Sequence, residues 1–297
     1  MSSPVIFNRR LGKNEIDLLF DLIESTSRKK INRIQSSKFF QLDDAIAFMS
    51  SIEDKAIGGS IVYRDRTRLG MVLAGLAISD EYRDVGLYTV VKSSLPFFKT
   101  VAIRDVDALV VERDKDDTLG FPHSFCLPSW SKSVLGRIGF VEEQKLFSCN
   151  LKMKDGNIPD YDKVSWDQEA NLEGARSLIW DEGKVLGMTN SIIWMSLDIA
   201  HQFNNLYTLT QENTTKLAFS YDFHEPILII SFITMRSDSC SSTTAQRILA
   251  SIIKETNATE VQFPLVGVGQ VNLLENLADE IGGTLMKQSI TLMRRKL

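Results

Sequence analysis

The segment Leu73–Tyr88 (LAGLAISDEYRDVGLY) constrains the fold more than any other part of the sequence. An apolar run ends in a polar turn, an arginine and a glycine follow three residues apart, and an amphipathic stretch begins after them. Such a turn leaves backbone N–H groups unpaired at a helix N-terminus, where the helix dipole also favours negative charge. The segment therefore predicts a strand–turn–helix unit that can hold an anion such as a pyrophosphate.

Length and composition indicate a globular chain with a large core. The chain has 297 residues, of which 43% are hydrophobic, and this suits two domains of ordinary size. No apolar run is long enough to cross a bilayer and the N-terminal sequence lacks the pattern of a secretory signal, so we expect no membrane association. Three scattered cysteines without metal-ligand spacing favour the reducing cytoplasm.

Charge is distributed unevenly along the chain. Residues 1–154 hold 23 Lys/Arg and 20 Asp/Glu, a balance of +3, whereas the remainder holds 11 and 18, a balance of −7. The first part is thus the better receptor for an anionic ligand. Basic runs with interleaved aromatic residues are absent from the sequence, and we expect no nucleic-acid partner.

The order of the expected elements repeats once. Residues 155–164 lack periodicity and contain glycine, proline and acids, so they are predicted to link a first domain, residues 1–154, to a second, residues 165–297. Each part contains helices, a meander, then strand–helix–strand–helix–strand. We expect an α/β (α+β) fold of two tandem copies, each a mixed, mostly antiparallel sheet flanked by helices. The expected elements include helices at Glu15–Ile23 and Lys29–Ile34 and strands at Ala45–Ile52, Met71–Ile78, Ile227–Met235 and Leu285–Met293.

Residues 5–153 resemble the GCN5-related N-acetyltransferase (GNAT) superfamily in two motifs. The turn Arg83-Asp84-Val85-Gly86-Leu87-Tyr88 resembles the family's Gln/Arg-x-x-Gly-x-Gly/Ala, with Tyr88 where the family usually has a small residue. The second motif is a late helix ending in Gly-Phe, here Gly139-Phe140; family members often carry a general-acid Tyr four residues before this glycine, and this chain has Leu135. Residues 165–297 resemble a degenerate copy, because the counterpart of the turn, residues 235–242, has no glycine.

The resemblance implies acetyl-CoA, or another acyl-CoA, as co-substrate and no metal. It implies that backbone N–H groups of the turn bind the pyrophosphate, with Arg83 nearby, and that the preceding strand pairs with pantetheine. The implied cofactor-binding residues are Leu76, Ala77, Ile78, Arg83, Asp84, Val85, Gly86, Leu87 and Tyr88. The alternative is an ordinary helix start capped by Asp80 or Asp84, after a strand that is merely buried.

Proton transfer has three weak candidates, none of which the sequence assigns. His123 follows a predicted strand in an apolar loop, which the family's layout places near the acetyl group, and its imidazole titrates near neutral pH. Glu53 ends an early strand that could face an acceptor, and Tyr82 lies next to the turn. Each also suits a structural role: a packed loop for His123, a solvated surface acid for Glu53 and a packing residue for Tyr82.

Three functions remain open from the sequence, one of which is an enzyme of the same fold that acts on a peptide or aminoacyl substrate. The first is an acyl-CoA-dependent N-acetyltransferase that transfers an acetyl group to an amine-bearing small molecule or peptide. The alternative is a non-catalytic protein of the same fold that binds acyl-CoA or serves as a scaffold. Leu135 and Tyr88 favour the alternative, because both depart from the family's motifs.

Overall fold

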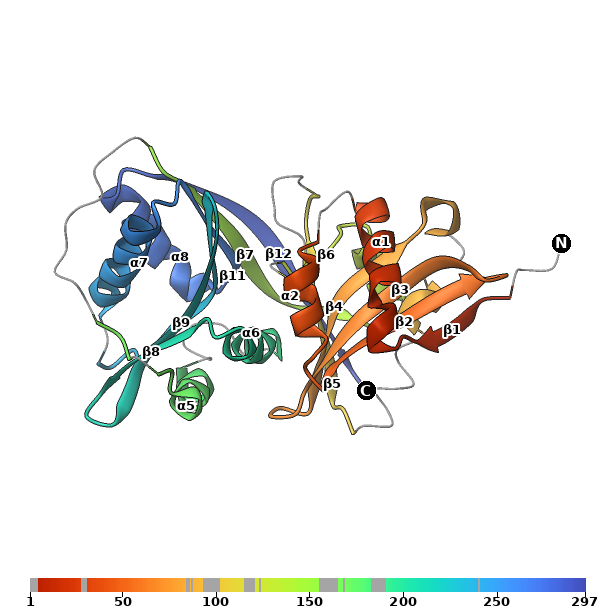
Figure 1. Cartoon of the computed structure of the whole chain (residues 1–297), viewed down its shortest axis with the longest axis horizontal. Helices are drawn as coiled ribbons and strands as arrows, with labels where there is room; N and C mark the ends of the chain where they lie inside the picture. Colours follow the sequence, from red (N-terminus) through yellow and green to blue (C-terminus); the bar gives the residue numbers. More distant parts are fainter. Residues whose placement is uncertain are drawn as a thin grey trace. The chain divides into compact units, whose positions relative to one another are not determined.

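The chain forms two compact units in its computed structural model (Figure 1). The structure describes residues 5–27, 31–83, 86, 88–92, 102–114, 121–122, 124–154, 165–167, 169–182, 191–239 and 241–297. The N-terminal unit comprises Met1–Lys145 together with Ile290–Leu297, and the C-terminal unit comprises Leu146–Ser289.

This division differs from the one expected from sequence. The expected linker, residues 155–164, lies outside the described residues. The last strand, β12 (Thr284–Lys296), was expected to complete the second copy, yet its residues from Ile290 to Lys296 pair antiparallel with β5 (Asp105–Val111) in the N-terminal unit. The N–H and C=O groups along one side of β5 need hydrogen-bond partners over the whole strand, and β12 supplies them.

The N-terminal unit is a mixed sheet in the order β1-β2-β3-β4-β5-β12, in which the pairing of β4 with β5 is parallel and the other pairings are antiparallel. Helices cover both faces, because an added Cβ on Gly58 would meet Val90 whereas one on the next residue, Gly59, would meet Leu19 of α1. The elements of this unit are β1 (Phe7–Arg10), η1 (Lys13–Glu15), α1 (Ile16–Ser27), α2 (Arg33–Phe39), β2 (Ala45–Ile52), β3 (Lys55–Asp65), β4 (Gly70–Ile78), η2 (Asp80–Tyr82), helical residues 88–92, β5, β6 (Cys126–Leu127), α4 (Ser131–Arg137) and the start of β7 (Val141–Lys152).

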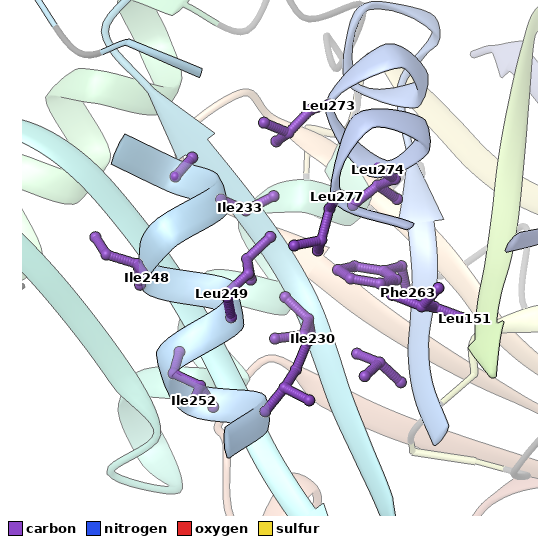
Figure 2. Packing of buried hydrophobic residues seen from close by; sticks show 14 of the residues in the cluster. Leu151, Ile230, Ile233, Ile248, Leu249, Ile252, Phe263, Leu273, Leu274 and Leu277 are labelled. Atoms are coloured by element: carbon purple, nitrogen blue, oxygen red, sulfur yellow. The ribbon is translucent and has the colours of Figure 1, made fainter. Parts of the chain in front are cut away.

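The C-terminal unit repeats this plan in the strand order β7-β11-β10-β9-β8. Figure 1 shows α5 and α6 on one side of this sheet and α7 and α8 on the other. Figure 2 shows the core on the second side, where Ile230 and Ile233 of the sheet meet Leu249 and Leu277 of the helices. The elements are α5 (Leu172–Glu182), α6 (Ser191–Gln202), β8 (Leu206–Gln211), β9 (Thr214–His224), β10 (Ile227–Met235), α7 (Ser242–Thr256), β11 (Glu260–Val266) and α8 (Val268–Glu280).

Local sequence signals placed most elements correctly. The strands at Ala45–Ile52 and Ile227–Met235 have the predicted bounds. The short helix predicted at Lys29–Ile34 is wrong in position, because Asn32 is an N-cap whose side chain accepts the N–H of Gln35, and α2 therefore runs from Arg33 to Phe39.

The two late helices end in the same way. After α4, Gly139 has φ +93° and the N–H of Phe140 donates to the carbonyl of Leu135 at 3.0 Å. After α8, Gly282 has φ +65° and the N–H of Gly283 donates to the carbonyl of Ala278 at 2.8 Å. Both are Schellman motifs, in which a left-handed residue turns the chain back onto the helix. The Gly-Phe motif is thus a helix stop, and it gives a fixed point for aligning the two copies.

A buried ion pair joins β12 to the N-terminal unit. Arg294 and Asp107 lie opposite each other in the β5–β12 ladder, and the guanidinium Nε and Nη2 donate to the two carboxylate oxygens at 2.7 and 3.1 Å. Asp107 is 0% exposed and Arg294 9%. Burial opposes the charged form of Arg294, but hydrogen bonding and the charge of Asp107 outweigh burial, so that its pKa is raised.

We expect Arg294→Met to reduce the free energy of unfolding by about 3–5 kcal/mol, because the substitution leaves the Asp107 carboxylate buried without its partner. Urea unfolding measures this loss. The control is Arg9→Ala, which removes an exposed bidentate pair with Glu15 and should cost about 0–1 kcal/mol. The double variant Asp107→Leu/Arg294→Met should recover most of the loss; equal effects of Arg294→Met and Arg9→Ala would contradict the prediction.

Asp105 stands next to this pair in a less favourable setting. Among the described residues its Oδ1 is buried without a hydrogen-bond partner. Burial raises its carboxyl pKa, the charge of Asp107 raises it further, and Arg294 and Arg68 counteract these effects only in part. The ionised form of Asp105 is therefore less stable in the folded chain than in the unfolded chain.

We expect Asp105→Asn to raise the melting temperature at pH 7. Because the folded-state pKa lies above the unfolded value, the wild type loses stability as pH rises through the window between the two, and the amide does not. The gain should shrink as the solution is acidified toward the ordinary carboxyl pKa of about 3.9. Melting curves from pH 4 to 8 test this, with the exposed Asp43→Asn as control; a gain that is constant with pH would argue against the assignment.

Candidate functional site

The two central strands of the N-terminal unit separate shortly after they begin to pair. β4 pairs in parallel with β5 over Gly70–Val72. Farther along, Leu109 and Val110 of β5 pair instead with the two-residue strand β6, which also lies beside β4. The second part of β4 is therefore no longer joined to β5, and no strand of the described residues pairs with it on that side, although β6 lies close by.

A bulge and one hydrogen bond fix which backbone groups face this edge. Gly75 pairs with Ile61 and Leu73 with Val62, so Ala74 is an extra residue in β4. The N–H of Ser79 donates to the carbonyl of Ile57 on β3 at 2.8 Å. Since successive backbone groups of a strand point to opposite edges, Ala77 also faces β3, whereas Leu76 and Ile78 present their N–H and C=O groups to the diverging side. Of the three strand residues predicted to pair with a ligand, Leu76 and Ile78 have the orientation that such pairing requires, and Ala77 does not.

The turn after β4 places a cation at the start of the next helix. Arg83 pairs with Asp80 and lies over the ring of Trp130, with its guanidinium carbon 5.2 Å from the ring centroid. Its Nε is buried and has no hydrogen-bond partner among the described residues. Sequence reasoning did not select Trp130, and an aromatic residue directly before α4 was the available signal. The predicted residues Asp84, Val85 and Leu87 lie outside the described residues.

Gly86 and Tyr88 occupy opposite sides of this helix. An added Cβ on Gly86 would meet the side-chain ends of Ile57 and Ile78 at 3.3 and 3.4 Å, so the glycine lets the helix approach the sheet closely. Tyr88 is 45% exposed, and the ammonium of Lys92 lies 5.2 Å from its ring centroid. The tyrosine is therefore a surface residue, and core packing does not limit its size.

The proposed proton-transfer residues do not form a catalytic cluster among the described residues. Glu53 is an exposed residue of the β2–β3 hairpin turn with φ 48°. Tyr82 is half-buried, and the ammonium of Lys55 lies 5.6 Å from its ring centroid while pairing with Glu81 at 3.2 Å. His123 lies outside the described residues. The hairpin and the turn thus meet through Lys55, which sequence reasoning had not selected.

The position of the family's acidic Tyr belongs to the core. Leu135 is 0% exposed and packs among the apolar residues beneath α4, including Val106 and Phe140. Its side chain has no ionisable group, and its burial leaves it no contact with solvent.

The corresponding turn of the C-terminal unit is an ordinary helix start. The hydroxyl of Ser241 accepts the N–H of Thr244 at 3.2 Å at the N-terminus of α7. A side chain of the chain itself therefore satisfies one of the N–H groups that an anion would need. This agrees with a degenerate second copy.

Two further observations concern ligands and membranes. Among the described residues, no group of three or more His, Cys, Asp or Glu side chains is arranged to hold a metal ion. The helices in the described part of the chain are all too short or too polar to cross a membrane.

Comparison with known proteins rests on structure. No protein-family model and no curated sequence matches the chain. The fold is similar to that of a proposed acetyltransferase from Pyrococcus horikoshii (TM-score 0.66, 12% identity, 98% of this chain and 89% of the other). It is also similar to a tandem GNAT protein of the clavulanic acid biosynthesis pathway (TM-score 0.64, 7% identity, 98% of each chain). A third similar structure is a GCN5-related N-acetyltransferase from Sphaerobacter thermophilus (TM-score 0.60, 11% identity, 98% and 95%).

These likenesses establish the fold. The chain has the tandem fold of the GNAT acetyltransferases, built from mixed, mostly antiparallel sheets flanked by helices. The fold class and the family resemblance inferred from the two motifs are confirmed at this level.

The helix that follows the turn packs against the sheet at two glycines, and we expect their substitution by alanine to differ in effect. We expect Gly58→Ala to cost about 1–3 kcal/mol of stability, because its Cβ would lie 2.6 Å from Val90 and 2.9 Å from the carbonyl of Ala77. Gly86→Ala should be near neutral, because its neighbours are flexible methyl groups and alanine favours a helix by up to about 1 kcal/mol. Thermal melting measures both, with Gly136→Ala, which meets open space, as reference; equal losses at Gly58 and Gly86 would show the packing to be misassigned.

Proposed function

We propose that the chain is an acyl-CoA-dependent N-acetyltransferase that transfers an acetyl group from acetyl-CoA to an amine. The observation that carries the proposal is the edge of β4 at Leu76 and Ile78, which pairs with no strand among the described residues and leads directly into the turn that holds Arg83. An extended ligand with amides at one end and a pyrophosphate at the other suits a backbone edge that is followed by a cationic turn.

The described residues fit such a ligand in two respects. The backbone of Leu76 and Ile78 can pair with an amide in the manner of an added strand. The buried, unpartnered Nε of Arg83 is a donor available to a phosphate oxygen, and the ring of Trp130 holds the guanidinium in place. The backbone N–H groups of residues 84–88 are proposed to complete the pyrophosphate site, with Gly86 allowing the helix to lie close to the sheet.

Acetyl transfer from a thioester to an amine requires that the amine lose a proton and that the leaving thiolate gain one or be stabilised. Within this proposal His123, Glu53 and Tyr82 remain the candidates for proton transfer. We further propose that the acceptor is an amine-bearing small molecule or peptide. We also propose the cytoplasm as the compartment, which the free thiol of Cys149 suits.

Leu135 favours a second candidate function. Because a fully buried leucine stands where the family often has its acid, the chain could bind acyl-CoA without transferring the acyl group. Such a protein would be an acyl-CoA-binding or scaffold protein of the same fold. Both functions predict acyl-CoA binding by the N-terminal unit, and they differ in turnover.

Calorimetric titration with acetyl-CoA tests the shared part. We expect Arg83→Ala to weaken binding by about 10- to 100-fold, the loss of one charge-assisted contact. Gly86→Asp should abolish binding, because its side chain would meet Ile57 and Ile78 and push the start of this helix, with its N–H groups, away from the sheet. Matched controls are Arg10→Ala on β1 and Gly136→Asp, a glycine with open space around it. Wild-type protein that binds no acetyl-CoA, or Gly86→Asp protein that binds normally, would refute the site.

Thiol release separates the two functions. With a panel of amines and peptides, an acetyltransferase releases free CoA thiol in proportion to the acceptor consumed. Binding without acceptor-dependent thiol release would favour the non-catalytic protein. Candidates whose substitution leaves turnover intact are excluded from proton transfer.

A further inference from the structure

The C-terminal unit contains the same strand divergence as the N-terminal unit. β10 pairs in parallel with β11 over Ile227–Ile229 only, which are its first three residues. Between Ile229 and Phe232 it carries one residue more than β9, as β4 does relative to β3. The second copy has therefore kept the geometry that leaves part of a strand edge without a strand partner, although it has lost the glycine-containing turn.

One hydrogen bond aligns the two edges residue by residue. The N–H of Arg236 donates to the carbonyl of Lys216 on β9 at 2.8 Å, just as the N–H of Ser79 donates to β3. Each donor is the first residue after its strand, β4 or β10. Ile233 lies three residues before Arg236, and Leu76 lies three residues before Ser79. Ile233 is thus the counterpart of Leu76, and its carbonyl points to the diverging side of β10.

A side chain of the chain itself occupies this position. The Nε2 of Gln270, in the first turn of α8, donates to the carbonyl of Ile233, and its Oε1 accepts the N–H of Gly267 at 3.0 Å. Gln270 is 4% exposed. Figure 2 shows the apolar surroundings: Ile233 lies between α7 and α8, near Leu249 and Leu273. In such surroundings a carbonyl without a donor is costly, and the carboxamide supplies the donor.

The N-terminal unit lacks this arrangement. The Schellman glycines Gly139 and Gly282 align the two late helices, and counting back from them places Leu127 of β6 where α8 has Gln270. Leu127 is buried and apolar, and α4 has 7 residues against 13 in α8. Among the described residues no side chain hydrogen-bonds the backbone of Leu76. Its edge is thus available to an amide from outside the chain.

We infer that the side chain of Gln270 takes the place of a ligand amide at the β10 edge. It thereby closes the C-terminal unit to acyl-CoA, so that each chain binds one acyl-CoA. This stoichiometry rests on the proposed function, because it assumes that Leu76 receives an acyl-CoA amide. The residue type is specific: a glutamate could still accept the N–H of Gly267 but would direct a carboxylate oxygen at the carbonyl of Ile233.

The first experiment uses no acyl-CoA. In protein labelled with ¹⁵N, we expect the side-chain amide protons of Gln270 to exchange with solvent at least tenfold more slowly than those of Gln211, which is exposed at the end of β8. Gln270→Glu should lower the melting temperature of the chain by about 3–10 °C, the effect of leaving one buried acceptor unpaired, while Gln211→Glu should leave it unchanged. Equal exchange rates, or equal melting temperatures, would overturn the assignment.

The second experiment counts bound acetyl-CoA by calorimetry. One site per chain, lost in Gly86→Asp and unchanged within twofold in Gln211→Glu, is the expected result. A second site, or a site that survives in Gly86→Asp, would show that Gln270 does not close the C-terminal unit. Wild-type protein that binds no acetyl-CoA would refute the proposed function instead, and the exchange and melting measurements would still decide whether Gln270 occupies the β10 edge.

Discussion

The structure depends on a constraint that both copies share: the two central parallel strands stay paired for only three residues. Gly70–Val72 and Ile227–Ile229 are joined to β5 and β11, and beyond them neither strand has a strand partner on that side among the described residues, which leaves a gap in the hydrogen-bond ladder. Buried backbone groups need partners, so each copy must fill the gap from within or accept something from outside. The bulges in β4 and β10 belong to the same geometry, because an extra residue bends a strand away from its neighbour.

The two copies meet this constraint differently. In the C-terminal unit α8 begins early enough to bring Gln270 to the carbonyl of Ile233. In the N-terminal unit the same stretch of chain is the strand β6, which pairs with β5 and leaves Leu76 and Ile78 on the edge of β4. The position at which the late helix begins therefore distinguishes the two copies. In the C-terminal unit a side chain hydrogen-bonds the strand edge, and in the N-terminal unit we infer that a ligand amide does so. The order of the five shared strands is the same in both, since β2-β3-β4-β5-β12 corresponds to β8-β9-β10-β11-β7.

Sequence patterns predicted what depends on neighbouring residues. The apolar run Ile227–Met235, the mainly apolar run Ala45–Ile52 and the glycine stops at Gly139 and Gly282 all act through local geometry, and the structure agrees with each. Pairings between distant residues were not predictable, because no local signal assigns Ile290–Lys296 to β5 rather than to its own copy. Gln270 was missed for a related reason: its capping partner is Gly267, which has no side chain to complete a recognisable capping motif, and its other partner is a backbone carbonyl. Of the candidate site, the position of Arg83 followed from its motif, whereas its stacking on Trp130 depends on the tertiary fold.

The pairing of β12 with β5 of the first copy has a consequence for the order in which the chain can fold. During synthesis the ribosome produces β5 long before residues 290–296, with the entire C-terminal unit in between. Until then the N-terminal sheet has an unpaired edge, and Asp107 has no guanidinium beside it. Contacts so distant in sequence form late and slowly, since a long loop must close first. A chain that ended at residue 154 would therefore lack one strand of its own N-terminal sheet. The two units therefore depend on each other in assembly, because the N-terminal sheet is complete only when Ile290–Lys296, which follow the C-terminal unit in the chain, have paired with β5.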